Sequence, residues 1–480
     1  MAKFRKILIA NRGEIAIRVM RAANEMGKST VAIFAEEDKL SLHRFKADEA
    51  YKIGEGLGPV ASYLNIKEII SVAKKAKVDA IHPGYGLLSE KPEFAKECGL
   101  AGIKFIGPTA ESMEKLGNKA NARKIAEKAG VPVIPASNIL PDNPKELVKI
   151  AENIGFPLML KASWGGGGRG MRLIKSIEEV EKNILEGKRE AENAFGNSES
   201  FLERYIKNAR HVEVQILGDK KGNIYHLWER DCSIQRRNQK VIERAPAPYL
   251  NDRQRDTVCE MATAICKQVK YECAGTVEFL MDVNTNEFFF IEVNPRIQVE
   301  HTITEEITGI DIVRAQILLS EGSNLNDAIG KKNQAEIVCN GHAIQCRITT
   351  EDPLNNFIPD YGRITAYRGA TGMGIRLDGG TAYSGAIITR FYDSLLEKVT
   401  AWAPTPEDSI SRMDRALREF RIRGVSTNIS FVENLLKHKK FQDNLYTTKF
   451  IDETPELFQF SERQDRATKL LNYISKITIE

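Results

Sequence analysis

The stretch LMLKASWGGGGRGMRLIK, from Leu158 to Lys175, places four consecutive glycines between two short apolar runs. A flexible linker is normally flanked by polar sequence, but LMLK and MRLI predict a pair of strands, and Trp164 stands directly before the glycines. Glycine permits positive φ and close backbone approach, and consecutive N–H groups can form a concavity that binds anions. A linker and a plain tight hairpin are the alternatives to the interpretation that this pattern favours, a loop that covers phosphate groups.

Three cationic side chains support a phosphate site. Arg169 follows the glycines directly, and Lys161 ends the apolar run PLML, where a charged group needs a partner. Lys119 lies at the start of a helix predicted in GNKANAR. A single lysine is usually a surface residue, so these cations support the interpretation only in combination with the glycines.

A second motif, FFFIEVNPRIQVEH from Phe288 to His301, carries polar groups at alternate positions. In an extended chain, a period of two puts these groups on one face and the apolar residues between them on the other. A solvated strand face is the alternative, but FFFI is typical of a core, and the upstream run TVEFLMD places Glu278 between two apolar residues. The polar face consists of Glu292, Asn294, Arg296, Gln298 and Glu300.

The carboxylates of this motif predict a divalent metal site. Glu278 and Glu292, with the amide of Asn294, offer the hard oxygen ligands that suit Mg²⁺ or Mn²⁺, and phosphate oxygens and water complete the coordination of such ions. Arg296 suits a small planar anion, and Glu300 is a candidate general base. Together with the glycine loop, the motif predicts that ATP activates an oxyanion substrate next to the metal.

Two further polar segments extend the candidate site. HLWERDCSIQRRNQKVIERAPAP, from His226 to Pro248, is dense in arginine, glutamine and lysine, and its interleaved apolar residues favour a structured edge over a solvated face. In HVEVQILGD, alternation places His211, Glu213 and Gln215 on one strand face. A lone structural histidine is the alternative to a ligand-binding one.

The composition is that of an ordinary globular chain. Its 480 residues predict about three domains, and a net charge of +4 argues against nucleic acid or a membrane surface as partner. No apolar run approaches the ~20 residues that a membrane span needs. The seven cysteines lack paired CxxC spacing and the first residues lack a signal peptide, so we expect reduced thiols and a cytoplasmic location.

Residues 6–110 alternate short apolar runs with amphipathic stretches, which predicts a parallel sheet with helices on both faces. The turn after the first strand is NRGE, so the GxGxxG fingerprint of dinucleotide binding is absent from it. After Ala335 the sequence becomes rich in predicted strands, and a helical tail follows.

Several motifs together resemble biotin carboxylases of the ATP-grasp superfamily: KILIANRGEIAIRV, HPGYGLLSE, KASWGGGGRGMR, ERDCSIQRRNQK and FIEVNPRIQVEHTITE. The resemblance runs to about residue 450. The segment TPELFQF, the following RQDRATKLLNYISKITI and Trp164 are similar to the same part of single-chain pyruvate carboxylases.

The resemblance implies an α/β and α+β multidomain fold. The expected parts are a Rossmann-like pre-ATP-grasp domain at 1–117, an ATP-grasp domain at 118–334 with a mobile glycine-rich lid at about 135–205, a strand-rich C-terminal domain at 335–450, and the start of a linker or allosteric region at 451–480.

The implied activity is carboxylation of biotin at N1′ by ATP and bicarbonate through carboxyphosphate, as in the first half-reaction of pyruvate carboxylase in gluconeogenesis. The implied partners are biotin, free or on a carrier domain, a carboxyltransferase domain, acetyl-CoA as activator and further copies of the chain. Alternatives are the biotin carboxylase of another enzyme such as acetyl-CoA carboxylase, a ligase of the carbamoyl phosphate synthetase type, and a nucleotide-binding regulatory module.

The resemblance also implies roles for individual residues. Glu300 would deprotonate bicarbonate held by Arg296, Arg376 would stabilise the biotin enolate, and Lys240 would assist catalysis. The implied ATP-binding residues are Lys119, Lys161, Gly165, Gly166, Gly167, Gly168, Glu203, Ile206, His211, Gln235 and Leu280. The implied metal ligands are Glu278, Glu292 and Asn294, and the bicarbonate and biotin residues are Arg296, Gln298, Val299, Glu300 and Arg376.

For the phosphates of acetyl-CoA, the candidates by resemblance are Arg347, Arg421, Arg423 and Arg466. Ordinary interdomain salt bridges are the alternative for each of them. The chain departs from the family at Asn238, where RRHQK is common and this sequence has RRNQK, which weakens any role for an imidazole there.

Overall fold

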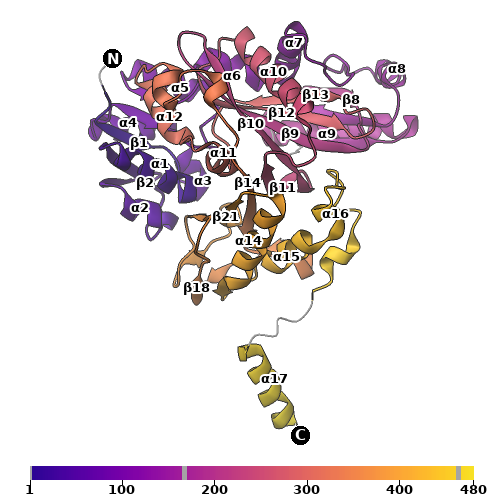
Figure 1. The fold of residues 1–480 in the computed structure, drawn as a ribbon. Coiled ribbons are helices and arrows are strands. Elements are labelled where there is room, and N and C mark those ends of the chain that lie inside the picture. Colours follow the sequence, from indigo (N-terminus) through magenta and orange to yellow (C-terminus); the bar gives the residue numbers. More distant parts are fainter. Residues whose placement is uncertain (1–2, 165–169, 461–465, 480) are drawn as a thin grey trace.

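The computed structural model describes residues 3–164, 170–460 and 466–479, and Figure 1 shows its elements in chain order from indigo to yellow. The mixed α/β organisation expected from the sequence is confirmed. The seven cysteines are all unpaired. Within the described ranges, the helices are too short or too polar to cross a bilayer.

The N-terminal region is a five-stranded parallel sheet, as the strand–helix alternation predicts. Its strands are β1 (Lys6–Ile9), β2 (Ser29–Phe34), β3 (Glu49–Lys52), β4 (Ala80–His82) and β5 (Lys104–Phe105), in the order β3-β2-β1-β4-β5. Its helices are α1 (Gly13–Glu25), α2 (Leu42–Lys46), α3 (Pro59–Tyr63), α4 (Ile66–Lys75), α5 (Pro92–Leu100) and α6 (Ala110–Gly117). Ile7 and Ile9 pack in one core and Leu8 packs in another, so the sheet is buried on both faces.

The NRGE turn between β1 and α1 is held by an asparagine side chain. The Nδ2 group of Asn11 donates hydrogen bonds to the carbonyls of Pro83, at 2.7 Å, and Tyr85, at 2.8 Å. Next to this junction the hydroxyl of Tyr85 donates to Glu14, at the start of α1. The turn therefore brings Glu14 and Tyr85 to the same place in the molecule.

The glycine-rich stretch belongs to a small antiparallel sheet. Its strands β6 (Leu158–Ala162), β7 (Arg172–Ile174) and β8 (Ser200–Arg204) have the order β7-β6-β8. Leu158 pairs with Ile174, so the predicted pair of strands on either side of the glycines is confirmed. The helices α8 (Pro144–Ile154) and α9 (Val180–Phe195) cover this sheet with an apolar core. Residues 165–169, which contain the four glycines and Arg169, lie outside the described residues.

An eight-stranded antiparallel sheet forms the centre of the molecule (Figure 1). In spatial order it comprises β13 (Phe288–Asn294), β12 (Cys273–Asp282), β9 (Ala209–Gly218), β10 (Ile224–Arg236), β11 (Gln239–Ala245), β14 (His342–Thr349), β21 (Leu395–Ala403) and β19 (Ile375–Gly379). The pairing of β11 with β14 carries the sheet across residue 335, where the sequence analysis divides two domains.

Helices complete the two sides of this sheet. On the central part these are α7 (Lys119–Lys128), α10 (Asp252–Gln268), α11 (His301–Thr308), α12 (Ile312–Ser320) and α13 (Leu325–Ile329). On the C-terminal part, α14 (Pro406–Glu419), α15 (Ile429–Lys437) and α16 (Lys439–Gln442) pack in one apolar core with β14 and β21. The remaining elements are β15 (Glu351–Asp352), β16 (Ile358–Pro359), β17 (Gly362–Arg363), β18 (Ala366–Arg368), β20 (Ile387–Ile388), β22 (Arg421–Arg423) and α17 (Arg466–Ile479).

Candidate active site

A cavity of about 750 Å³ lies where three regions of the chain meet. These are the N-terminal region from β1 to α6, the central region from α7 to α13 and the C-terminal region from β14 onward. The N-terminal region contributes Glu14, Tyr85 and Glu90 to its lining. The C-terminal strands contribute Arg347, and the central sheet and the chain that follows β13 contribute the largest polar group. The lining also includes Lys119, the first residue of α7. From the sheet and the chain after β13 it includes His211, Gln235, Lys240, Glu278, Glu292, Asn294, Arg296, Gln298, Val299 and Glu300.

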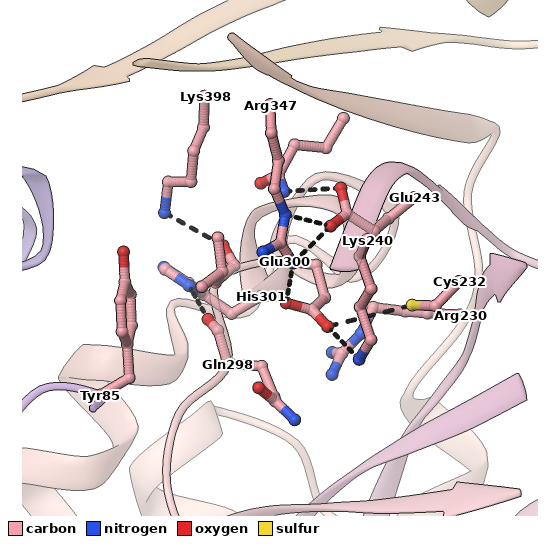
Figure 2. Close-up of polar contacts among 12 residues, drawn as sticks. Tyr85, Arg230, Cys232, Lys240, Glu243, Gln298, Glu300, His301, Arg347 and Lys398 are labelled. Carbon is pink, nitrogen blue, oxygen red and sulfur yellow. Dashed lines mark hydrogen bonds and ion pairs between the residues drawn. The ribbon is translucent and has the colours of Figure 1, made fainter. Parts of the chain in front are cut away.

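Glu300 lines this cavity, and 1% of its surface is exposed. Its Oε1 atom is 2.6 Å from Nζ of Lys240, and its Oε2 atom is 3.1 Å from a guanidinium nitrogen of Arg347 (Figure 2). Burial alone would raise the pKa of Glu300, but these two cations hold it below its usual value. The carboxylate is therefore ionised at neutral pH and able to accept a proton.

Lys240 connects Glu300 to two other carboxylates. Its Nζ atom lies 2.6 Å from Glu213 and 3.0 Å from Glu278. Burial would lower the pKa of Lys240, but the Cys232 thiol and the three carboxylates around it raise that pKa well above its usual value. In the described part of the chain, two clusters of side chains are close enough to share a metal ion: His211, Glu213 and Glu278, and Glu213, Cys232 and Glu300. Both contain Glu213 and lie around the ammonium group of Lys240.

The carboxylates predicted to bind metal lie directly opposite each other, since Glu278 of β12 pairs with Glu292 of β13. The Nδ2 group of Asn294 donates to Glu278 at 3.0 Å. Nζ of Lys119 is 3.0 Å from Glu292, and Nε2 of His211 is 3.1 Å from Glu278. Burial would raise the pKa of Glu278, but Lys240 and His211 lower it. Two carboxyl groups and an amide, all lining one cavity, fit the hard-oxygen requirement of Mg²⁺.

The predicted polar face is extended only as far as Asn294, where β13 ends. Beyond it the chain turns, so the prediction of a continuous alternating strand to Glu300 is wrong for residues 295–300. Pro295 has no N–H group for a sheet ladder, and this explains the departure. Ile297 is buried, but Val299 lines the cavity together with Gln298 and Glu300, which strict alternation would not allow.

Arg296 lines the cavity, and other residues of the predicted polar face hold its side chain. Its guanidinium group donates to Gln298 at 2.7 Å, to Asn294 at 3.2 Å and to Glu90. Gln298 in turn donates to Glu278 at 3.1 Å. Arg296 and Gln298, two of the residues that the resemblance implies for bicarbonate, therefore form one hydrogen-bonded chain with Asn294 and Glu278.

The expected ATP-binding residues fall into two groups. Lys119, His211 and Gln235 line the cavity, and Gln235 lies 2.8 Å from Nδ1 of His211. Lys161 instead forms an ion pair with Glu203 on the neighbouring strand of the small sheet. Neither member of that pair lines the cavity, and the same holds for Ile206 and Leu280 among the described residues. Gly165, Gly166, Gly167 and Gly168 lie outside the described residues.

Two arginines occupy places that differ from those the sequence analysis expects. Arg347, a candidate for acetyl-CoA, lines the cavity on β14, and its Nε atom donates to Glu243 at 2.6 Å. Arg376, expected beside biotin, lies on β19 and pairs with Glu305 and Asp378, each at 2.7 Å, and it is not among the described residues of the lining. The physical reason is the strand order, because β21 separates β19 from β14.

Of the other candidates for the activator, Arg421 and Arg423 are not among the described residues that line this cavity. Arg421 and Arg423 lie on β22, which pairs with β18. Arg466 begins α17, and its side chain is outside the described residues.

The sequence motifs predict a polar strand face at Glu213 but do not show which buried charges it meets. Arg230 and Glu213 are fully buried, pair directly across β10 and β9, and are joined at 2.6 Å. Glu243 is also fully buried and bonds to Arg347. The alternation in HVEVQ and the ERD triplet are local signals for this set, but only the strand register shows that the charges meet.

The chain has clear relatives among known families. The family described as "Biotin carboxylase, N-terminal domain" matches residues 3–113, "Carbamoyl-phosphate synthase L chain, ATP binding domain" matches 118–328, and "Biotin carboxylase C-terminal domain" matches 345–453. The pyruvate carboxylase of Bacillus subtilis is 54% identical over 479 residues, which cover 99% of this chain and 41% of that protein.

Solved structures give the same result. Pyruvate carboxylase of Rhizobium etli, determined with the allosteric activator acetyl coenzyme A, has a TM-score of 0.94 and 63% identity, covering 98% of this chain and 42% of its own. The chain thus spans about two fifths of the length of these relatives.

A second structure is matched along its whole length. The biotin carboxylase domain of Hydrogenobacter thermophilus 2-oxoglutarate carboxylase, in complex with MgADP, ADP and bicarbonate, has a TM-score of 0.92 and 44% identity over 96% of this chain and 100% of its own. Since this match covers nearly all of this chain and the whole of that domain, the chain belongs to the biotin carboxylase family.

Proposed function

We propose that this chain carboxylates biotin at N1′ with ATP and bicarbonate, as the first half-reaction of a pyruvate carboxylase. The observation that carries the proposal is that one cavity is lined both by the opposed carboxylates Glu278 and Glu292 and by Glu300, which lies between Lys240 and Arg347. Nζ of Lys240 contacts both Glu278 and Glu300. These contacts support a base next to the position at which a phosphate-activating metal would bind.

Glu278, Glu292 and Asn294 would hold Mg²⁺, which would offset the negative charge of the ATP phosphates. In the described structure Lys119 and Lys240 neutralise these carboxylates. Both lysines are therefore placed to exchange a carboxylate partner for a phosphate oxygen when the nucleotide enters. Lys161, paired with Glu203, offers the same exchange on the small sheet beside the glycine stretch.

Glu300 would take the proton of bicarbonate, and Arg296 would orient the anion through its planar fork. The oxygen freed by that transfer would attack the terminal phosphorus of ATP and displace ADP, which gives carboxyphosphate. Carboxyphosphate would then break down to CO₂ and phosphate. The phosphate would take the N1′ proton of biotin, and the resulting enolate would attack CO₂. Arg347 would supply the positive charge for the biotin enolate, in place of Arg376, because it is the arginine of the C-terminal strands that lines the cavity. Its bonds to Glu243 and Glu300 hold the guanidinium in position before the substrate arrives.

The proposal is tested by ADP formation from purified chain, ATP and Mg²⁺, with and without bicarbonate and free biotin. We expect ADP to form only with bicarbonate, and biotin to increase the rate. ATP cleavage at an unchanged rate in bicarbonate-free buffer would refute the proposal. Counting carboxybiotin per ADP then separates biotin carboxylation from simple ATP hydrolysis.

Glu292→Gln is expected to raise the Mg²⁺ concentration for half-maximal ADP formation by about 10-fold, because a neutral amide replaces one of two anionic ligands. The measurement is a Mg²⁺ titration at constant MgATP. Glu287→Gln is the matched control, since Glu287 precedes β13 at an exposed position of the same connection. Equal Mg²⁺ dependence of both variants would contradict the assignment of the metal ligands.

The wider protein is part of the same proposal. Its other parts would carry biotin and transfer the carboxyl group to pyruvate, acetyl-CoA would activate it, and copies of the chain would form a homo-oligomer. We place the protein in the cytoplasm on its unpaired cysteines.

A further inference from the structure

Lys398 on β21 is a lysine with 0% of its surface exposed. An ammonium group in such a position is costly unless it is both paired and hydrogen-bonded. The proposed reaction does not involve this side chain, and it does not line the cavity among the described residues. Its partners therefore need a separate explanation.

The partners of Lys398 come from all three regions of the chain. Its Nζ atom forms a 3.0 Å ion pair with Glu14, at the start of α1. The same atom donates a 3.1 Å hydrogen bond to the carbonyl of Val299. Asp378 lies directly opposite on β19, where burial would raise its pKa and Lys398 lowers it.

The Val299 carbonyl belongs to the planar peptide bond that joins Val299 to Glu300. The preceding carbonyl, that of Gln298, accepts a 2.7 Å bond from Nδ1 of His301. Burial and the nearby cations, Lys398 among them, lower the pKa of His301 well below its usual value, so the ring is neutral. The two peptide planes on either side of Val299 are thus both held by buried side chains.

A second contact to Glu300 comes from the same pair of strands. Arg347 on β14 lies directly opposite Lys398 on β21. Arg347 contacts the carboxylate of Glu300, and Lys398 contacts the peptide bond from which Glu300 begins. Two neighbouring positions of one sheet therefore hold Glu300: Arg347 contacts its carboxylate, and Lys398 contacts the backbone directly before it.

We propose that Lys398 is a positioning residue for the base Glu300. It holds the peptide plane before Glu300, and through Glu14 it ties that plane to the N-terminal region. This inference rests on the proposed function, because it assumes that Glu300 is the base. The competing explanation is that Lys398 only neutralises Glu14 at a buried contact between regions.

Two variants separate these explanations. Lys398→Met removes the ammonium group and leaves Glu14 without its ion-pair partner, so thermal stability should fall. The double variant Glu14→Gln with Lys398→Met removes both charges together, so much of that stability should return. If Lys398 only neutralises Glu14, turnover should return with it.

We expect the double variant to regain thermal stability but to keep a kcat for bicarbonate-dependent ADP formation on the order of 10- to 100-fold below the unchanged chain, as for a misplaced catalytic group. The KM for ATP should stay within about 2-fold, since Lys398 does not contact the carboxylates of the metal site. Recovery of kcat together with thermal stability would overturn the inference. An unchanged chain without bicarbonate-dependent turnover would instead refute the proposed function, and the inference with it.

Discussion

Replacing Glu300 by glutamine is expected to lower bicarbonate-dependent ATP cleavage by about 10²- to 10⁴-fold, the usual loss when a general base is removed. The amide keeps the size of the side chain but cannot accept a proton. The pKa of Glu300 lies below its usual value in the folded chain, so the unchanged enzyme holds this group ionised across neutral pH. The measurement is kcat for ADP formation at saturating bicarbonate, with KM for ATP determined in parallel.

The matched control is Glu305→Gln, a buried carboxylate one turn further along α11. Glu305 also pairs with arginines, Arg18 at 2.8 Å and Arg376 at 2.7 Å, so its replacement disturbs ion pairs of the same kind away from the cavity. We expect this control to lower thermal stability and to keep kcat within about 5-fold of the unchanged chain. Equal losses of kcat in both variants would mean that charge disruption, and not loss of the base, explains the effect.

Features that depend on local periodicity were predictable from the sequence. The parallel sheet follows from alternating apolar runs and amphipathic stretches, and the pair of strands around the glycines follows from LMLK and MRLI. The opposed carboxylates Glu278 and Glu292 also follow from two flanking strand patterns. In each case the signal is the apolar pattern within single short segments, and periodicity is informative over segments of that length.

The end of the strand at Asn294 has a local signal in the sequence, the proline that follows it. Proline cannot donate to a sheet ladder, so Pro295 marks the end of β13. The polar side chains converge on the cavity even so, because Arg296 and Gln298 bond to Asn294 and Glu278 across the turn. Their convergence depends on these bonds and not on strand alternation.

The arrangement of the C-terminal charges could not be predicted, because it depends on strand order. β14 joins the central sheet beside β11, whereas β19 lies at the sheet edge beyond β21. Neither position can be inferred from the sequence near Arg347 or Arg376. Each arginine lies in a short apolar segment, and such a segment does not show which strand it will pair with. The Glu213–Arg230 pair likewise depends on the register of β9 and β10.

This difference in strand position leads to the second prediction of large effect, a comparison of Arg347→Gln with Arg376→Gln. We expect Arg347→Gln to lower carboxybiotin formation by about 10²- to 10³-fold, the usual loss when a preorganised donor to a developing oxyanion is removed. Arg376→Gln should mainly lower thermal stability, because it removes one of the two guanidinium partners of Glu305 and the guanidinium partner of the buried Asp378. The measurement is carboxybiotin formed per unit time, alongside thermal unfolding.

The comparison also separates the role of Arg347 toward biotin from its effect on the base. Removing a cation 3.1 Å from Glu300 should raise the pKa of that carboxyl and weaken ATP cleavage at low pH. A base is lost as the pH falls through its pKa, so at high pH Glu300 is ionised in both proteins. A loss of carboxybiotin that persists at high pH therefore belongs to the biotin step. If Arg376→Gln caused that loss and Arg347→Gln did not, the enolate cation would be the edge-strand arginine, which would have to reach the cavity by a movement of β19.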